Sequence, residues 1–362
     1  MIKTYKFKLY QNDDTKKLDK VLLISGNVWN HAIALQKRHY KIFGKKVGKF
    51  TLQKHLTKLK KMEKHAHWRA IPSQAFQQIV ERVENSYTLF FSNVKNKIKA
   101  SPPKFRKSSK YKSFTLKQAG YKITGNSIVL TGRGWKHKTK FFKSREIPSN
   151  IKTITIKKDT RGNYFMFITA EVEKPNRATT GKIAGIDFGL KTFLTLSDGR
   201  KIESPLFFFQ DLKEIRKANR KLSKKVKYSK NYMKAKRELS RLHEKIANRR
   251  NDWHHKTSTA LAVEFDEIFI EDLCLKGMKK LWGRKISDLA YYKFILMLEY
   301  KTEKFAKVDR FFPSTRLCHV CGVVSEKKEL NIREWTCQCG AHHDRDENAA
   351  INIRVAGHSH LQ

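Results

Sequence analysis

Four of the five cysteines of the chain lie near its carboxyl end in two closely spaced pairs. The pairs are Cys318 with Cys321, and Cys337 with Cys339. Thiolates at these spacings suit a tetrahedral Zn²⁺ ion, which would hold together two short loops that have no hydrophobic core of their own. Because a single residue separates the second pair, His342 or His343 is an alternative fourth ligand. The pattern therefore predicts a structural zinc site formed by these four cysteines.

Three acidic residues that are far apart in the sequence occupy positions suited to a second metal site. Asp187 follows an apolar strand, Glu271 ends another, and Asp346 lies at the start of a helix. Singly, each has an ordinary explanation as a turn residue, a strand-end ion pair or a helix cap. Together they predict a catalytic Mg²⁺ site, because a pair of Mg²⁺ ions ~4 Å apart needs about three carboxylates to hold it.

Other polar residues near these sites carry weaker predictions. Asp344 is either an outer ligand of the Mg²⁺ site or a residue that stabilises the zinc loops. Arg345 is expected to contact a phosphate or Asp344. Cys274 lies in an apolar stretch and is expected in the core, and His358 and His360, in a short tail, are expected to have no role.

The charge of the chain indicates its class of partner. It has 78 Lys and Arg against 33 Asp and Glu, a formal net charge of +45. Such a charge repels itself in a compact protein, so it predicts a polyanionic partner, with nucleic acid before an anionic membrane surface. No apolar run approaches the ~18 residues of a spanning helix. With no export signal and with metal-type cysteines, the protein is expected in a reducing cytosol.

The elements that position these residues fall into two halves. Residues 2–10 have the alternation of a strand, 13–100 have three helices, and 104–175 have short strands, so the first half is expected to be a small β-barrel with an inserted helical module. That module either contacts a polyanion or is a bundle with solvated charged faces. From residue 182 the predicted order is three strands to 204, helices over 211–264, a strand at 267–273, a helix at 287–305, a strand at 308–312 and a last helix from 347. This order is typical of an RNase H-like α/β sheet.

Several blocks of the second half resemble the TnpB family, nucleases encoded by insertion sequences and regarded as ancestral to type V CRISPR effectors. The blocks are GIDFGLKTFLTLSDG, SRLHEKIANRRNDWHHKTS, FIEDLCLKGM, FFPSTRLCHVCG and CQCGAHHDRDENAAINI. The first half resembles the wedge and recognition regions of that family more weakly. The resemblance implies a wedge barrel (1–12 and 101–178), a helical recognition module (13–100), a RuvC-like nuclease domain (179–312 and 344–362) and an inserted zinc ribbon (313–343).

The same resemblance implies an activity and its partners. A TnpB-like protein would be an RNA-guided DNA endonuclease, acting as a monomer with a guide RNA from the transposon end. It would cut double-stranded DNA beside a short motif, with Asp187, Glu271 and Asp346 as catalytic acids and the four cysteines as zinc ligands. Two alternatives stay open: an RNA-guided DNA-binding regulator that does not cut, and an RNase H-fold transposase or resolvase that acts without RNA.

Overall fold

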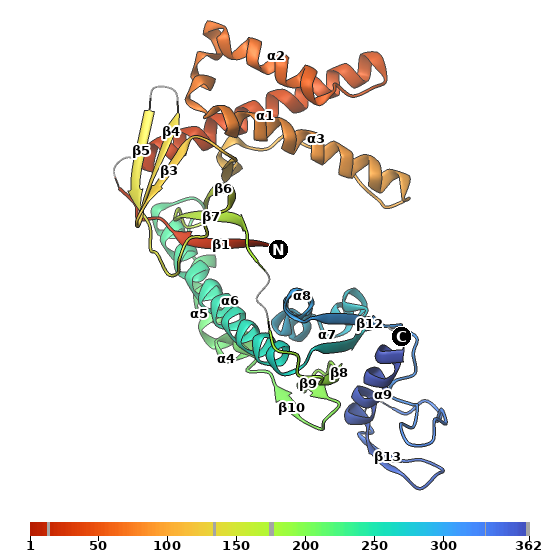
Figure 1. Ribbon diagram of the computed structural model, residues 1–362. Helices are drawn as coiled ribbons and strands as arrows, with labels where there is room; N and C mark the ends of the chain where they lie inside the picture. Colours follow the sequence, from red (N-terminus) through yellow and green to blue (C-terminus); the bar gives the residue numbers. More distant parts are fainter. Residues whose placement is uncertain (13–14, 133–134, 174–176, 330, 360–362) are drawn as a thin grey trace. The chain divides into compact units, whose positions relative to one another are not determined.

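The computed structural model describes residues 1–12, 15–132, 135–173, 177–329 and 331–359. The chain divides into two compact units, Met1–Pro175 and Asn176–Gln362 (Figure 1). Among the helices described, none is both long and apolar enough to cross a membrane.

The strands of the first unit form two antiparallel sheets. One has the order β1-β7-β6-β2 and the other β3-β4-β5, and a bridge between Leu9 and Phe141 connects them. The strands are β1 (Ile2–Lys8), β2 (Ser113–Leu116), β3 (Tyr121–Thr124), β4 (Ser127–Gly132), β5 (Trp135–Lys140), β6 (Ile151–Lys158) and β7 (Tyr164–Glu171). In the described residues these are two open sheets and not the single closed barrel expected from the sequence. Strand β5 was not predicted because its alternate residues are mostly lysine rather than apolar.

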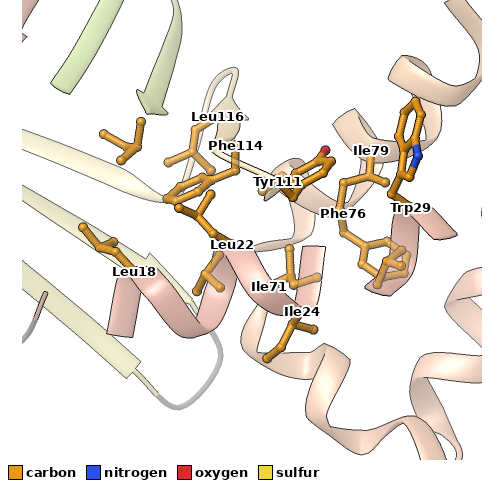
Figure 2. Close-up of a cluster of buried hydrophobic side chains, with 14 of the residues drawn as sticks. Leu18, Leu22, Ile24, Trp29, Ile71, Phe76, Ile79, Tyr111, Phe114 and Leu116 are labelled. Atoms are coloured by element: carbon orange, nitrogen blue, oxygen red, sulfur yellow. The ribbon is translucent and has the colours of Figure 1, made fainter. Parts of the chain in front are cut away.

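The helices of the first unit share one buried core with both sheets. The helices are α1 (Thr15–Phe43), α2 (Lys49–Lys61) and α3 (Ser73–Lys95), with a 3₁₀ segment at Glu63–Ala70. Leu18 and Leu22 of α1 belong to the same buried cluster as Phe114 and Leu116 of β2 (Figure 2). The helical module is therefore inserted in sequence but shares one core with the strands. The expected apolar stripe of α3 is buried only as far as Tyr87, and its last turns are exposed.

The second unit is built on a five-stranded sheet of order β10-β9-β8-β11-β12. The strands are β8 (Ile183–Asp187), β9 (Thr192–Leu196), β10 (Lys201–Glu203), β11 (Glu267–Glu271) and β12 (Lys304–Val308). The first three form an antiparallel meander, and β11 runs parallel to both β8 and β12, which is the layout that the sequence predicted. Consecutive residues of β11 are buried, as expected for a parallel strand covered on both faces.

The helices of the second unit differ from the prediction at one place. They are α4 (Phe207–Gln210), α5 (Leu212–Ser223), α6 (Lys230–Glu264), α7 (Leu275–Leu289), α8 (Tyr291–Lys301) and α9 (Arg345–Ser359). The helix expected at 287–305 is in fact the end of α7 and the whole of α8, separated at Ala290, which has a left-handed backbone (φ 49°). As α8 ends early, β12 lies four residues before the strand expected at 308–312. Two glycines in α7, Gly277 and Gly283, lower its helix propensity and explain why it was missed.

Helix α9 lies directly on the sheet because glycine is present where the two meet. A Cβ atom on Gly185 of β8 would lie 2.1 Å from the Ala350 carbonyl oxygen and 2.4 Å from the Arg354 amide nitrogen of α9. A Cβ on Gly357 of α9 would lie 2.3 Å from the ring of Phe269 in β11. Both separations are far below van der Waals contact, so no larger residue fits without moving the helix.

We expect Gly185→Ala to destabilise the second unit by about 1–3 kcal/mol, since the added methyl group meets backbone that cannot move without lifting α9 from the sheet. Urea unfolding followed by fluorescence would measure this change. Gly283→Ala is the matched control, because no atom lies within 4 Å of its added Cβ, and it should be neutral or stabilising. Equal stability of Gly185→Ala and the unaltered protein would contradict the close packing.

The core of the second unit contains a histidine that is unfavourable to protonate. His254 of α6 lies among aromatic rings, with centroids 5.7 Å from Phe193 and 5.4 Å from Phe294. Burial, and then the positive charges of Arg250 and Lys293, lower the pKa of His254 to about 4. The folded protein thus keeps this imidazole neutral at pH values where the unfolded chain protonates it.

Acidification should therefore weaken the second unit. The stabilising contribution of neutral His254 is complete above the unfolded-state pKa of about 6.5 and is lost as the pH falls toward 4. At pH 5, a folded-state pKa of about 4 and an unfolded-state pKa of about 6.5 lower the free energy of unfolding by about 2 kcal/mol. Urea unfolding at pH 7 and pH 5 measures the loss in the free energy of unfolding on acidification. This loss should be about 2 kcal/mol smaller in His254→Gln than in the unaltered protein. An identical loss in the two proteins would contradict the prediction.

Candidate functional site

The three predicted acids lie at one edge of the second unit's sheet. Asp187 is the last residue of β8 and Glu271 is the last residue of β11. These strands are parallel neighbours in which Ile186 pairs with Ile270, so the two acids end adjacent strands at the same edge. Asp346 is the second residue of α9, the helix that packs on β8. Acids that lie 84 and 75 positions apart along the chain are thus brought to one place by sheet order and helix packing.

The charges of the three acids influence one another. Burial, followed by the negative charges of Asp346 and Glu271, raises the pKa of Asp187 to about 7. Burial and the neighbouring Asp272 also raise the pKa of Glu271, against the opposing charge of Arg310. Carboxylates that raise one another's pKa in a partly dry site are stabilised by a bound cation, and oxygen ligands of this kind are those that Mg²⁺ and related divalent ions prefer. The donor set therefore fits a divalent metal ion.

The acids are close but not gathered as tightly as ligands of one ion. Within the described residues, only the cysteine set has three or more potential ligand atoms that all lie within 4.8 Å of one another. One acid also has a cationic partner: Nη1 of Arg333 lies 3.0 Å from both carboxylate oxygens of Asp346.

Asp344 fixes the helix end that carries Asp346. Its Oδ1 accepts hydrogen bonds from the backbone amides of Asp346 (2.9 Å) and Glu347 (3.0 Å), the pattern of an N-cap. Its Oδ2 accepts a hydrogen bond from Nζ of Lys201 on β10 at 2.7 Å. Although burial opposes the effect, Lys201 and these amides lower the pKa of Asp344. Asp344 thus caps α9 and ties it to the sheet, while its expected role as an outer metal ligand stays a prediction.

Arg345 does not contact Asp344, one of the two partners expected for it, and its expected contact with a phosphate stays a prediction. Its Nη1 donates to the backbone carbonyls of Glu329 (2.9 Å) and Ile332 (3.4 Å), in the loop between the two cysteine pairs. In the described residues its side chain is bonded to neither Asp344 nor another carboxylate. It holds that loop against the start of α9.

The four predicted cysteines converge as expected. Cys318 Sγ lies 3.8 Å from Cys339 Sγ, and Cys321 Sγ lies 3.6 Å from Cys337 Sγ. A tetrahedral ion with metal–sulfur bonds of about 2.3 Å places its sulfurs about 3.8 Å apart, so this set fits one. His343 Nε2 lies 3.1 Å from Cys318 Sγ, and all four sulfurs already belong to the set. His343 is therefore an outer partner of a thiolate rather than a replacement for one.

The cysteine loops lie against α9 and bring together four sulfurs that could hold a metal ion. Their own apolar core is small: Cys318, Trp335 and Cys337 are buried together, with Ala341 packed against them. The short strands β13 (Glu334–Thr336) and β14 (His342–Asp344) form a two-stranded sheet beside them. Such a module cannot bury enough surface to hold itself together.

Two asparagines of α9 attach the first cysteine loop to the helix. Asn348 Nδ2 donates to the Leu317 carbonyl at 2.8 Å, and Asn352 Nδ2, one turn on, donates to the same carbonyl at 2.7 Å and to that of Ser314 at 2.8 Å. Both asparagines are buried. The helix that carries Asp346 therefore holds the cysteine module as well as the sheet.

Sequence reasoning missed four of these residues: Lys201, Arg333, Asn348 and Asn352. Asparagine is unfavourable inside a helix, so two of them one turn apart were a usable signal. No local signal marks Lys201, because its partner Asp344 is distant in sequence. None marks Arg333, because its contact with Asp346 depends on the β13–β14 hairpin. Two minor expectations were wrong. Cys274 is exposed instead of being in the core, and His358 contacts Glu267 (3.2 Å), while His360 lies outside the described residues.

Known families match most of the second unit. A family model described as probable transposase, named for OrfB of IS605, matches residues 167–281. A second model, described as the TNB domain of Cas12f1-like proteins, matches residues 291–353, which include all four cysteines and Asp346.

Solved structures share the fold. The protein of a Cas12f1–sgRNA–target DNA complex matches with a TM-score of 0.66 and 12% identity, over 98% of both chains. The mini-RNA-guided endonuclease CRISPR-Cas_phi3 matches with a TM-score of 0.57 and 11% identity, over 98% of this chain and 92% of the other. At these identities the likeness concerns the mixed α+β fold alone.

Relatives of similar length match along almost the whole chain. A protein of Escherichia coli (strain K12), InsQ, is 29% identical over 92% of this chain and 87% of its own length, and is named as a candidate RNA-guided DNA endonuclease. A protein of Streptomyces pristinaespiralis with the same kind of name is 34% identical, over 98% of this chain and 89% of its own length. Proteins of Acanthamoeba polyphaga mimivirus that match three quarters of the chain are named TnpB-like. The chain therefore belongs to the TnpB family.

Proposed function

We propose that this protein is an RNA-guided DNA endonuclease that hydrolyses phosphodiester bonds at Asp187, Glu271 and Asp346. The observation that carries the proposal is the burial of Asp187 beside two other acids: burial, followed by the negative charges of Asp346 and Glu271, raises the pKa of Asp187 to about 7 at the edge of the sheet. Acids kept in such a site without a function would cost stability. The names of the relatives, which are candidate RNA-guided DNA endonucleases, support the same activity.

The residues of the chain have distinct roles in this proposal. Asp187, Glu271 and Asp346 would hold divalent ions, with Mg²⁺ as the expected one. Mg²⁺ bound there would supply an activated water and stabilise the leaving oxyanion. Asp344 and Lys201 orient the first turn of α9 and hence the carboxylate of Asp346.

Packing next to Asp187 fixes the backbone that follows β8. Phe188, the next residue, is buried and packs edge-on against Tyr291 of α8, with ring centroids 4.9 Å apart. The hydroxyl of Tyr291 in turn donates to the Gly189 carbonyl. These contacts keep the backbone after β8, and with it Asp187, in one position.

Guide RNA and target DNA are the proposed partners. Exposed basic residues line α5 with Glu214 as the one acid among them: Lys213, Arg216, Lys217, Arg220 and Lys221. Of these, Lys221 already pairs with Glu238 at 2.7 Å, while a row of cations along one helix suits a phosphate backbone. The solved relative of similar fold, whose title names an sgRNA and target DNA, supports this choice. The same proposal includes the domain boundaries given above for a TnpB-like chain. It also includes a ribonucleoprotein that contains one copy of the protein.

For the cysteine module we propose a structural Zn²⁺ ion held by Cys318, Cys321, Cys337 and Cys339. Thiolate ligands and tetrahedral spacing favour zinc over the hard ions that carboxylates bind. The ion would hold the loop that carries Arg333 near α9, so that its role is to position residues around the acids rather than to react.

Replacing one acid tests the proposed activity. In a complex reconstituted with RNA from the transposon end, Asp187→Asn should lower cleavage by more than about 100-fold, because even outer-shell partners of metal ligands contribute about 10- to 100-fold. The substrate is a plasmid library in which random bases flank the guide-matched sequence, so the adjacent motif need not be known. Asp252→Asn, an exposed acid of α6 paired with Lys256, is the matched control.

The outcomes of this assay separate the three candidate functions. Cleavage that needs RNA and Asp187 supports the proposal. Guide-dependent binding without cleavage by the unaltered protein would instead indicate a regulator, and cleavage that is independent of RNA would indicate a transposase or resolvase. Full activity of Asp187→Asn would overturn the site.

The zinc proposal has its own test. The purified protein should contain about one Zn²⁺ per chain, and Cys337→Ser should lose most of it and unfold the module at a lower temperature, since three remaining ligands cannot order loops that have so small a core. Zinc content by atomic emission and limited proteolysis would measure both effects. Cys274→Ser, an exposed thiol outside the set, should keep its zinc. Full zinc content in Cys337→Ser would refute the assignment.

A further inference from the structure

Arg333 occupies the position beside Asp346 that a cation would take. A single nitrogen, Nη1, lies 3.0 Å from both carboxylate oxygens. A position equidistant from the two oxygens of one carboxylate is the one that a chelated divalent ion occupies. The arginine therefore neutralises one of the three proposed metal ligands from within the same chain.

The backbone at Arg333 is fixed by the cysteine module. The Arg345 amide donates to the Arg333 carbonyl at 2.7 Å, which extends by one position the β13–β14 ladder, where Glu334 pairs with Asp344. Cys337 directly follows β13, so the hairpin that carries Arg333 ends at the cysteine set. The module thus holds this arginine opposite the first turn of α9.

The contact is specific to one acid and is easy to release. In residues 177–329 and 331–359, Asp346 has an ion-pair partner, whereas Asp187 and Glu271 have none. Arg310, the cation near Glu271, pairs with Asp272. The side chain of Arg333 is 46% exposed, whereas that of Asp346 is 20% exposed. A change of rotamer would therefore move the guanidinium into solvent without any rearrangement of the core.

We propose that Arg333 competes with the divalent metal ion for Asp346: it holds this carboxylate in the metal-free protein and must leave it for the ion to bind. The inference rests on the proposed metal site at Asp187, Glu271 and Asp346. Arg333 is then an inhibitory residue of the cysteine module. It keeps the metal occupancy of the site low until its side chain leaves Asp346.

Metal binding to the full-length protein, freed of RNA, tests this competition without relying on cleavage. Free Mn²⁺ measured by electron paramagnetic resonance gives the affinity of the site. Arg333→Ala should bind Mn²⁺ about threefold to fivefold more tightly, the range that a partly exposed ion pair can supply. Arg333→Lys, which keeps the charge, should show a smaller gain. The gain should vanish in the Asp346→Asn background, where there is no carboxylate to compete for.

Lys327→Gln is the matched control, because it removes one positive charge from an exposed position of the same cysteine module, while the ion pair of Asp346 is made by Arg333. If it tightens binding as much as Arg333→Ala, the effect is general electrostatics and the competition is overturned. Unchanged affinity in Arg333→Ala, or a gain that persists in Asp346→Asn, also overturns it. The unaltered protein should have a saturable Mn²⁺ site that is lost in Asp187→Asn. Absence of such a site would contradict the proposed metal site itself, and this result is recognised without the Arg333 variants.

Discussion

The direct contact between helix α9 and the central strand β8 is the constraint on which the rest of the second unit depends. Because Gly185 lacks a side chain, the helix backbone approaches the strand closely enough to bring Asp346 beside Asp187. The acids repel one another, so nothing in their own chemistry favours this arrangement without a cation. Apolar packing of the sheet and helix therefore holds together a charge cluster that would otherwise separate.

The cysteine module adds a second layer to this constraint. It is attached to the same helix through Asn348 and Asn352, it brings Arg333 to the first turn of α9, and its loop accepts hydrogen bonds from Arg345, the first residue of that helix. A core of three buried side chains, with Ala341 packed against them, gives this loop little rigidity of its own. The helix contacts the loop directly, and its four sulfurs could hold a metal ion. One short helix is thus connected to the sheet, to the cysteine set and to the acids.

Sequence patterns predicted those parts of the molecule that depend on local periodicity or on spacing. The run ending at Asp187 and the one ending at Glu271 were recognisable as buried strands, and the cysteine pairs as metal ligands, because these signals lie within a few residues. Strand β5 and helix α7 escaped because lysines and glycines masked their periodicity. The Lys201–Asp344 and Arg333–Asp346 contacts could not be foreseen, since each joins residues through tertiary packing. A closed barrel was expected because a run of short strands follows the helical module, but hydrogen bonding, not strand number, decides whether a sheet closes.

The charge of the chain and the charge of its site have opposite signs, and this contrast links binding to chemistry. A protein with a net charge of +45 attracts a polyanion strongly, yet a phosphodiester that approaches three carboxylates is repelled. Divalent ions reverse the local sign, so binding at the surface and reaction at the site become compatible only when the ions are present. Arg333 reverses part of the same charge from inside the chain. In the competition proposed above, Arg333 would hold Asp346 in the metal-free protein and oppose metal binding there, and a polyanion that competes for the guanidinium would release it.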